Sequence, residues 1–524
     1  MSNNVPPIRP SVLVCKGRIE EATYQDPIIP SYQNNPLIEA LPNIWDQQQV
    51  SELLAHYPVY REEHRQLPAH LRVHLTQDAL QLFTPLLIHF DLEQRFSRMI
   101  RLGYQARNPA TSIFWKEIHH RVELLQQPHH SIRSTATGFT IVGISGVGKT
   151  TSIEIILLLY PQVILHSEYR DVNFGFEQIV WLKLDCPFDG SIKGLCLNFF
   201  QAIDDLLDTN YYKEYVGKGA RATVDALLPN MARVASLHAI GVLVIDEIQH
   251  LSQAKSGGSS KMLNFFVQLI NTIGIPVVLV GTYKALSVLT GEFRQTRRGS
   301  GQGDLVWDRM VQDDTWSWFV ESLWEYQYVR NPSELTEQLS NVLYEESQGI
   351  TDFAVKLYML AQIEAITSGQ EAVTEESIRL AAQRNLKMAR PILDALRRGD
   401  TQKLMHVEDV HKPIDLDSAI EQAQTSLLRS PNSAISERTL TSTKANQKTE
   451  VNDKSVVSSA APAPVKTKPQ EALKRSRKVK NQVLEGSLVE IAAAGEKQKL
   501  SAYDALKQAG LIRPASEYLC KETS

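Results

Sequence analysis

The segment Gly143–Thr150 constrains the fold of this chain more than any other, because it reads Gly-Ile-Ser-Gly-Val-Gly-Lys-Thr and fits the pattern G-x-x-x-x-G-K-[ST]. An apolar β-type stretch, residues 138–142, precedes it, and an apolar helix-like stretch, residues 151–160, follows it. This order of strand, glycine-rich loop and helix holds polyphosphates, because backbone N–H groups and the positive helix end face the anion. A glycine-rich turn that matches by chance is the alternative, and the flanking strand and helix argue against it.

The residue types in this loop specify the phosphate chemistry. We expect Lys149 to reach the β- and γ-phosphates of ATP, and the Thr150 hydroxyl to be a ligand of Mg²⁺. Gly146 and Gly148 supply the backbone angles that turn successive N–H groups toward the anion. The expected nucleotide-binding residues are Gly143, Ser145, Gly146, Val147, Gly148, Lys149, Thr150, Thr151 and, from the next motif, Asp246.

A second motif places two carboxylates at the end of a buried strand. Residues 241–247 read Gly-Val-Leu-Val-Ile-Asp-Glu, and such an apolar run is typical of a central parallel strand. Ligand groups in open α/β sheets gather at the carboxyl ends of strands, so we expect Asp246 beside the phosphate loop as the second Mg²⁺ ligand. Glu247 is then the base that polarises the attacking water. A solvated acidic turn is the alternative, but it does not explain why both motifs occur together, and we predict ATP binding and hydrolysis.

With these motifs the chain resembles the AAA+ ATPases, and the resemblance assigns further roles. The strand-like segment 275–281 ends before Thr282, which matches the family's polar sensor residue near the γ-phosphate. A basic cluster further on matches the arginine finger that acts on a neighbouring subunit's nucleotide, and Arg297 or Arg298 is favoured over Arg294. A solvated basic helix end is the alternative interpretation of this cluster.

The chain departs from the AAA+ pattern in the expected lid. The family usually has an arginine in a Gly-x-x-Arg context at the start of a lid helix, whereas this chain has Asp352 in Gly-Ile-Thr-Asp. The lid is then expected to contact the γ-phosphate weakly, or through Lys356 one helical turn further on. This favours slow hydrolysis and a long-lived ATP-bound state, which suit a switch better than a motor.

Composition restricts the class of protein. The 524 residues suffice for several domains of ~100–200 residues each, and the net charge of -4 gives no overall field that attracts nucleic acid. The sequence has no signal-peptide pattern and no stretch of ~18 apolar residues, which predicts a cytoplasmic protein without a membrane anchor. Its four cysteines, Cys15, Cys186, Cys196 and Cys520, lie far apart without a C-x-x-C pair, so we expect neither a zinc site nor a disulfide framework.

Periodicity and composition divide the chain into six regions. Strands that alternate with helices predict an α/β core, a parallel sheet flanked by helices, followed by a helical lid. Asp91 is the expected N-cap of a helix over residues 91–101, and residues 179–184 read as a strand. The regions are an extended N-terminal arm for partner docking (1–60), a helical extension (61–135), the nucleotide-binding core (136–300), the lid (301–408), a largely disordered basic linker (409–484) and a short helical partner-binding peptide (485–524).

The tail allows two interpretations. Residues 425–470 are rich in small and polar types and contain too little apolar surface to offset chain entropy. A tether that ends in a stray helix is the plain interpretation. We favour a tether that touches DNA and ends in a peptide recognised by a partner protein, because its helix-like end, residues 500–512, has no other core to join.

Four further segments resemble the TnsC family, the AAA+ regulators of Tn-seven-like transposons. They are Tyr160–Val163, Leu195–Phe200, Val244–Ser252 and Met262–Phe266. Two of them, with Ile-Gln-His-Leu at 248–251 and Cys-Leu-Asn-Phe-Phe at 196–200, are more specific than the nucleotide motifs, which many unrelated ATPases share. The resemblance covers roughly residues 30–400 and implies an ATP-dependent regulator of DNA transposition.

The resemblance also implies partners and a location. With ATP, the family forms homo-oligomeric rings or filaments on duplex DNA, receives target information from a TnsD- or TniQ-type protein, and activates a transposase of the TnsA/TnsB type; some members serve CRISPR-associated transposons. Contacts to the phosphate backbone would make DNA binding largely independent of sequence, and hydrolysis would dissolve the assembly. Lys193 and Lys261 are the candidate DNA contacts, with an ordinary solvated lysine as the alternative for each. Such a protein is bacterial and associates with the nucleoid when on DNA.

Two other functions stay open at this point. An AAA+ DNA-remodelling motor or helicase loader would show brisk, DNA-stimulated hydrolysis. A signalling ATPase whose tail binds only protein would bind ATP and oligomerise without duplex DNA.

Overall fold

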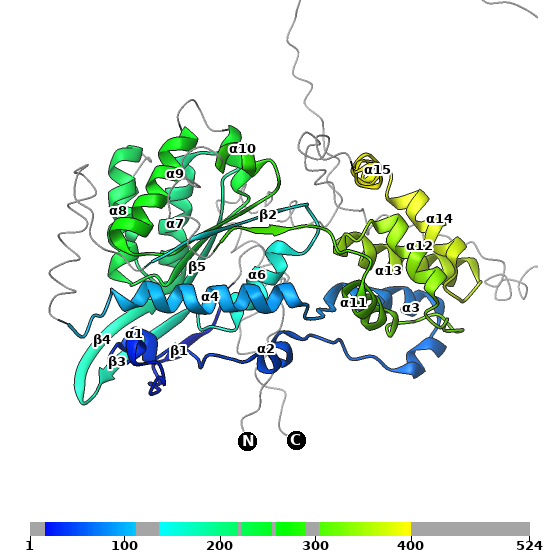
Figure 1. The fold of residues 1–524 in the computed structure, drawn as a ribbon, viewed down its shortest axis with the longest axis horizontal. Helices are drawn as coiled ribbons and strands as arrows, with labels where there is room; N and C mark the ends of the chain where they lie inside the picture. Colours follow the sequence, from blue (N-terminus) through cyan, green and yellow to red (C-terminus); the bar gives the residue numbers. More distant parts are fainter. Residues whose placement is uncertain (1–15, 112–135, 218–221, 254–257, 290–302, 400–524) are drawn as a thin grey trace, which may run out of the picture. The chain divides into compact units, whose positions relative to one another are not determined.

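The structure is a computed structural model that describes residues 16–111, 136–217, 222–253, 258–289 and 303–399. The predicted basic linker and C-terminal peptide, with Cys15 and Cys520, lie outside the described residues. An N-terminal part, an α/β core and a set of lid helices follow one another along the chain (Figure 1). Among the described helices, none combines the length and the apolar character needed to cross a membrane.

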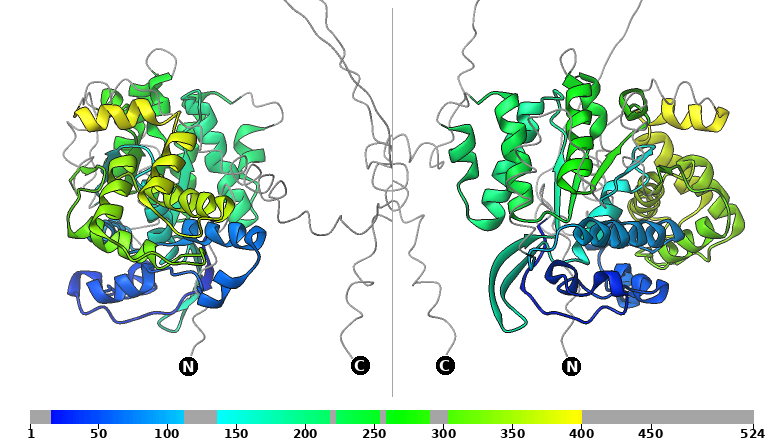
Figure 2. Two further views of the ribbon diagram at one scale, coloured as in Figure 1. Left: turned by 90° about the vertical axis from the view of Figure 1, so that its right-hand side faces the viewer. Right: turned by 60° about the vertical axis from the view of Figure 1, so that its left-hand side comes forward.

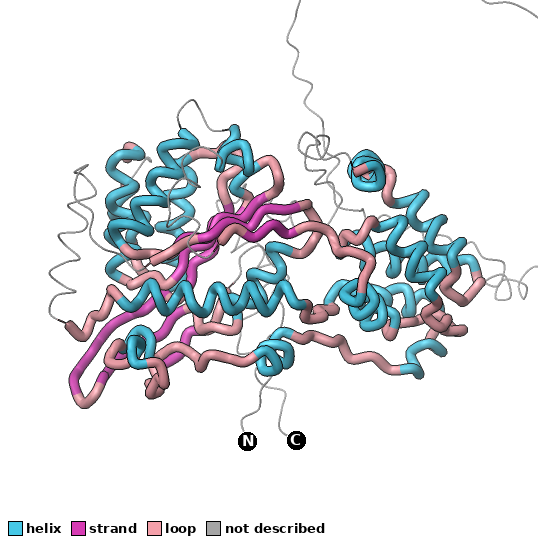
Figure 3. The backbone as a smooth tube through the Cα atoms, viewed as in Figure 1, coloured by secondary structure: helices cyan, strands magenta, loops and turns pink. Residues whose placement is uncertain are grey.

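Five parallel strands form the central sheet, in the order β5–β6–β7–β2–β8. Figure 3 draws the strands in magenta, with the helices around them in cyan. The strands are β5 (Trp181–Asp185), β6 (Val242–Asp246), β7 (Val277–Gly281), β2 (Phe139–Gly143) and β8 (Leu305–Trp307). Along β6, Val244 belongs to one hydrophobic cluster and its neighbour Ile245 to another. Since successive side chains point to opposite faces, both faces of the sheet are buried, and the strands therefore read as continuous apolar runs. The predicted parallel α/β core is confirmed.

Helices cover both faces of this sheet, as the two views of Figure 2 show. The cluster of Ile245 includes side chains of α7 (Ile192–Leu207), α8 (Val224–Leu237) and α9 (Gly258–Gln268). The cluster of Val244 includes α6 (Lys149–Leu158) and α4 (Leu87–Gln105). The short α10 (Ala285–Leu289) follows β7.

Helix α4 begins earlier than the sequence suggested. The expected N-cap, Asp91, lies inside the helix and pairs with Arg95 at 2.8 Å. The prediction was wrong because a ring nitrogen of His89 accepts the backbone N–H of Leu86 at 2.9 Å and caps the helix at that residue. A histidine in this role is not among the residues that usually signal a helix start.

The N-terminal part packs on the chain itself. It contains β1 (Ile19–Glu21), α1 (Pro36–Glu39), α2 (Gln47–Leu54), α3 (Ala69–Leu75) and α4. Strand β1 extends a second sheet formed by the antiparallel hairpin of β3 (Val163–Tyr169) and β4 (Val172–Ile179). The side chains of Leu37 and Ile38 are buried, and the carboxylate of Glu39 accepts a hydrogen bond from Tyr169 at 2.9 Å. Docking of this arm on a partner protein stays a prediction.

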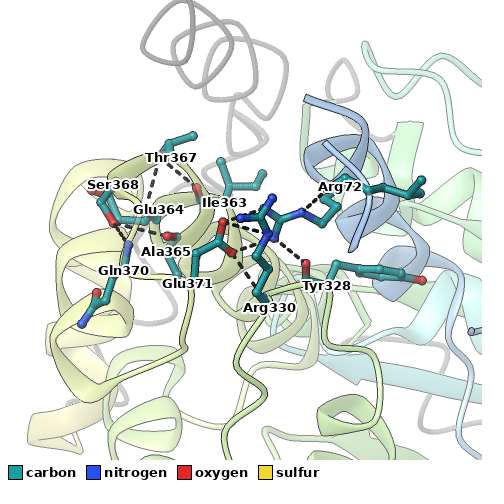
Figure 4. Close-up of polar contacts among 11 residues, drawn as sticks. Arg72, Tyr328, Arg330, Ile363, Glu364, Ala365, Thr367, Ser368, Gln370 and Glu371 are labelled. Atoms are coloured by element: carbon teal, nitrogen blue, oxygen red, sulfur yellow. Dashed lines mark hydrogen bonds and ion pairs between the residues drawn. The ribbon is translucent and has the colours of Figure 1, made fainter. Parts of the chain in front are cut away.

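The lid consists of helices, but the predicted boundary at residue 301 lies too early, because β8 at residues 305–307 belongs to the central sheet. The lid helices are α11 (Asp314–Trp324), α12 (Glu337–Ser347), α13 (Thr351–Ser368), α14 (Glu375–Asn385) and α15 (Arg390–Arg398). A buried ion pair joins the lid to α3: the Arg72 guanidinium donates to both carboxylate oxygens of Glu371, at 2.6 and 2.7 Å, and to the carbonyl of Tyr328 at 2.9 Å (Figure 4). Burial alone would raise the pKa of Glu371, but the hydrogen bonds from Arg72 and Arg330 outweigh it and lower that pKa.

Candidate active site

The loop between β2 and α6 has the backbone conformation that the phosphate-loop motif predicts. Gly146 and Gly148 have φ values of +84° and +91°, in the left-handed region where a residue with a Cβ atom is strained. Gly148 is the N-cap of α6, so the unpaired N–H groups of the first helical turn face the loop. This arrangement of N–H groups suits an anion.

Lys149 lies folded over the same loop. Its ammonium group donates to the carbonyl oxygens of Gly143 and Ile144, at 3.1 and 2.6 Å, and the residue is 8% exposed. Gly143 itself serves the fold, because a Cβ atom there would lie 1.8 Å from the carbonyl oxygen of Trp307 on the adjacent strand.

The two oxygens predicted to bind Mg²⁺ lie side by side. The Thr150 hydroxyl donates to Asp246 Oδ2 at 2.8 Å, and the backbone N–H of Glu247 donates to Asp246 Oδ1, also at 2.8 Å. Hydroxyl and carboxylate oxygens are the hard ligands that Mg²⁺ prefers, and the ion usually completes its shell with water and substrate phosphates. The residues present therefore fit the ion.

Lys183 was not predicted, and it lies beside this pair. Its ammonium group is 3.6 Å from Asp246, 3.0 Å from Asp185 and 3.2 Å from Glu154. Burial alone would lower the pKa of Lys183, but the three carboxylates outweigh burial and raise it above its ordinary value. Lys183 thus stays charged and neutralises part of the acidic cluster behind the loop.

The proposed base is held by a neighbour in sequence. Glu247 has φ of +56°, and its carboxylate accepts a hydrogen bond from the side-chain amide of Gln249. The carbonyl end of the same amide accepts the backbone N–H of Thr282 at 3.1 Å. The residues predicted as base and sensor are therefore linked through one buried side chain.

The loop, the acidic pair and the sensor enclose one cavity of about 530 Å³. The predicted residues that line it are Ser145, Gly146, Val147, Gly148, Lys149, Thr150, Thr151, Asp246, Glu247 and Thr282. Of the predicted nucleotide-binding set, Gly143 alone is absent from the lining. The carboxylates of Asp246, Glu247, Asp308 and Asp352 outnumber the cations Lys149 and Arg309 in the lining. A nucleotide polyphosphate would therefore need a divalent cation to offset the repulsion between like charges.

An apolar part of the cavity lining was not predicted from the sequence. It consists of Leu82, Phe83, Leu87 and Phe319, with Trp307 at the end of β8. No motif marks these residues, because they come from segments far apart in the sequence. An apolar wall in the same cavity as a phosphate loop suits the base of a nucleotide.

His89, which also lines the cavity, is neutral. Burial lowers its pKa to about 3. Its Nδ1 accepts the N–H of Leu86, so the proton sits on Nε2, which lies 3.1 Å from the Ser152 hydroxyl. His89 therefore adds ring surface, 4.8 Å from the Phe83 ring centre, and no charge.

The lid reaches the phosphate loop at the position that departs from the AAA+ pattern. The backbone N–H of Asp352 donates to the carbonyl oxygen of Gly146 at 3.0 Å. The carboxylate of Asp352 pairs with Lys356 at 2.7 Å, and Lys356 is not part of the cavity lining. Arg309, which no motif marked, lines the cavity and donates to the Gln348 side chain at 2.7 Å.

The remaining predicted residues either do not line the cavity or lie outside the described residues. Arg297 and Arg298, like Arg294, lie outside the described residues. Lys193 is half-buried in the first turn of α7, and Lys261 of α9 forms an ion pair with Asp225 of α8. Their contact with DNA stays a prediction.

Comparison with known proteins supports the fold. A family profile described as an AAA domain matches residues 132–289. No curated protein matches the sequence. Cdc6p from Pyrobaculum aerophilum is similar in structure, with 14% identity and a TM-score of 0.37, over 67% of this chain and 87% of that chain.

Two further solved structures are similar at the same level. One is the Walker-type ATPase of Pyrococcus abyssi, with 14% identity, a TM-score of 0.32 and coverage of 60% of this chain and 88% of that one. The other is the Aeropyrum pernix ORC1 protein in complex with DNA, with 15% identity, a TM-score of 0.32 and coverage of 59% and 76%. These likenesses are too distant to transfer an activity. The profile match and the site geometry agree, and the nucleotide-binding core of this chain is an AAA+ P-loop domain.

Proposed function

We propose that this chain is an ATP-dependent switch that assembles on duplex DNA and regulates transposition. The observation that carries the switch is the contact between lid and loop, in which the N–H of Asp352 binds the carbonyl of Gly146. A nucleotide in the cavity would touch both partners of this contact, so its phosphates would bias the lid position. The resemblance of four sequence segments to the TnsC family supports the role in transposition.

The residues of the cavity define the chemistry of hydrolysis. Backbone N–H groups of the loop would bind the phosphates, and Lys149 would exchange its two carbonyl partners for the β- and γ-phosphates. Thr150 and Asp246 would hold Mg²⁺, which neutralises phosphate charge when bound. Glu247 would orient and deprotonate the attacking water, with Thr282 beside the γ-phosphate.

Slow turnover follows from the composition of the lid. Where the AAA+ pattern has an arginine, Asp352 brings a carboxylate, and Lys356 is already paired with it at 2.7 Å. Less positive charge at the γ-phosphate means less stabilisation of the transition state. The ATP-bound state would therefore persist long enough to report that a target site has been found.

Assembly would complete the site between subunits. Arg297 or Arg298 of one copy would act as the finger on the next, and the basic groups of many copies would add weak, salt-sensitive phosphate contacts. A TnsD- or TniQ-type selector and a TnsA/TnsB-type transposase are the partners that this role requires.

A gel shift with duplex DNA tests the proposal, run without nucleotide, with ADP and with a non-hydrolysable ATP analogue. We expect a large complex, tolerant of DNA sequence, with the analogue only. Lys149→Ala should abolish it, because the ammonium that binds the phosphates is lost. Equal binding in every lane would show that nucleotide does not control assembly, and no binding in any lane would favour a signalling ATPase.

Hydrolysis is tested by Glu247→Gln. This variant should bind ATP and DNA normally. Its turnover of ATP should fall by at least about 100-fold, because a general base contributes about 100- to 10,000-fold to the rate. Its DNA complexes should accordingly persist after excess competitor DNA is added. Brisk DNA-stimulated turnover and strand displacement by the unmodified chain would replace the switch by a motor or helicase loader.

A further inference from the structure

The Ile-Gln-His-Leu run after the acidic pair links Glu247 to Thr282 through Gln249, and the proposed hydrolysis assigns it no role so far. It forms the short helix η5 (Ile248–Gln253), and two of its side chains bind the ends of neighbouring strands. His250 Nδ1 lies 3.1 Å from the carbonyl oxygen of Cys186, directly after β5. Gln249 instead bonds to Thr282, directly after β7, and to Glu247.

Both ends of the Gln249 amide have a partner. The NH₂ group donates to the Glu247 carboxylate, and the carbonyl oxygen accepts from the N–H of Thr282 at 3.1 Å. A flipped amide would set its oxygen against the carboxylate and its NH₂ group against an N–H donor, so only one orientation satisfies both partners. Gln249 is 4% exposed, and a lost bond would leave a buried polar group unpaired.

The surroundings of Gln249 leave it little room to move. A Cβ atom at Gly281 would lie 2.8 Å from Gln249 Oε1 and 2.7 Å from Ile248 Cγ2, so β7 passes close against η5. Glu247, by contrast, is only half-buried and has the left-handed φ of +56°, which is strained for a residue with a side chain. The rigid amide therefore fixes a carboxylate that faces a cavity.

We propose that Gln249 is a positioning residue for hydrolysis, which fixes the direction of the Glu247 carboxylate and ties it to Thr282. The inference rests on the proposed function, because it needs Glu247 as the base that activates water. A base acts only within hydrogen-bond reach of the proton it removes, so its misplacement costs rate. Nucleotide affinity, which depends on the loop, stays as it is.

The test replaces Gln249 with methionine, which has similar length and no polar ends. Gln249→Met should lower kcat for ATP roughly 10- to 100-fold, with the KM for ATP and the affinity for a fluorescent ADP analogue within about twofold. A higher kcat would mean that Gln249 restrains the base, and a rise in KM alone would mean that it serves binding. Either result would overturn the inference.

A double-mutant cycle separates positioning from loss of structure. If Gln249 acts through Glu247, the double variant Glu247→Gln with Gln249→Met should have a kcat within about twofold of that of Glu247→Gln alone. If the fold-losses in kcat of the two single variants multiply in the double variant, the inference is overturned, while Glu247 remains the base. Turnover of Glu247→Gln equal to that of the unmodified chain would instead overturn the base assignment in the proposed function, and this inference with it.

Gln362 offers a matched control. It is a fully buried amide in the lid that bridges the N–H of Tyr328 at 2.8 Å and the carbonyl of Tyr326 at 2.9 Å, and it does not line the cavity. Gln362→Met should lower the unfolding temperature but keep kcat per folded molecule. An equal loss of kcat in Gln362→Met and Gln249→Met would trace both to general packing and overturn the inference.

Discussion

Two groups of ion pairs are each built around a buried cation, and they differ in how completely their charges are balanced. One joins Arg72 of α3 to Glu371 after α13, away from the cavity. The other places Lys183 of β5 beside Asp246 of β6 and two further carboxylates, at the wall of the cavity. Both groups contain a buried cation, so burial alone does not tell a structural ion pair from a functional site.

The group at Arg72 is closed. The guanidinium is 0% exposed, donates to both oxygens of Glu371 and also to the carbonyls of Tyr328 and Leu67, at 2.9 Å each. The backbone N–H of Arg330 donates to the same carboxylate at 3.2 Å. The Arg330 guanidinium also lies 4.0 Å from this carboxylate, but its side chain is 53% exposed, so the buried charges are one guanidinium and one carboxylate. This geometry leaves no buried charge for a ligand to satisfy.

The group at Lys183 is open. One ammonium faces three carboxylates, so the cluster keeps an excess of negative charge, and Asp246 in it lines the cavity. Excess charge at a cavity wall attracts a cation. The balance of charge, more than burial, therefore distinguishes the cavity wall from the structural ion pair.

The largest expected effect is on the closed group. Arg72→Met should lower the free energy of unfolding by about 3–5 kcal/mol, because it leaves the carboxylate of Glu371 largely buried without its partner. Urea denaturation at neutral pH measures the loss. Magnesium and ADP together should add no more stability to this variant than to the unmodified chain, because the lost ion pair lies away from the cavity.

A surface ion pair of the lid provides the control for this prediction. Arg379 bonds to Glu345 and Glu346 at 3.1 and 3.3 Å, but its side chain is 49% exposed. Arg379→Met should cost at most about 1 kcal/mol, since water replaces the lost partner. Equal losses at Arg72 and Arg379 would contradict the closed, buried character of the first group.

At the open group we expect a smaller loss of stability, and magnesium should offset it. Lys183→Met should cost about 2 kcal/mol without magnesium, less than Arg72→Met, because Asp246 keeps its hydrogen bonds from Thr150 and Glu247. With ADP present throughout, added magnesium should stabilise this variant more than the unmodified chain, since the site has become more negative. Thermal unfolding with EDTA and with magnesium measures how much magnesium raises the unfolding temperature of each protein. Equal rises in Lys183→Met and in the unmodified chain would show that Lys183 does not offset charge at the ion site.

The sequence predicts the two groups to very different extents. Lys149, Thr150 and Asp246 follow from two short motifs, because a strand that ends in a loop fixes where its next residues lie. Arg72 and Glu371 are 299 positions apart, and no local pattern connects them. The apolar part of the cavity lining was missed for the same reason, as was the contact of Lys183 with Asp246. Gln249 stands two positions after Glu247, but its second partner, Thr282, lies on another strand end, and no local pattern connects the two.

The fold shows the same division. Burial on both faces makes β6 and β7 readable as continuous apolar runs, which are typical of central strands, and the parallel sheet was predicted from such runs. The β3–β4 hairpin was not predicted. Its turn places Arg170 and Asp171 at φ of +52° and +62°, without the glycine that usually marks a tight hairpin. Residues 179–184, predicted as one strand, divide between β4 and β5 at Val180.

The smallest expected effect is the pH dependence of the closed group in acid. The pKa of Glu371 is lowered in the folded chain, because hydrogen bonds from Arg72 outweigh burial. Its stabilisation is therefore complete above the unfolded pKa of about 4.3 and is lost as the pH falls through the folded value. The difference in unfolding free energy between the unmodified chain and Arg72→Met should then be full at neutral pH and narrow in acid, as urea denaturation over this range would measure. In Glu371→Gln no carboxylate titrates, so its difference from Arg72→Met should change less over the same range. A gap between the unmodified chain and Arg72→Met that stays constant in acid would mean that the guanidinium stabilises the junction through its carbonyl partners and packing instead of the charge of Glu371.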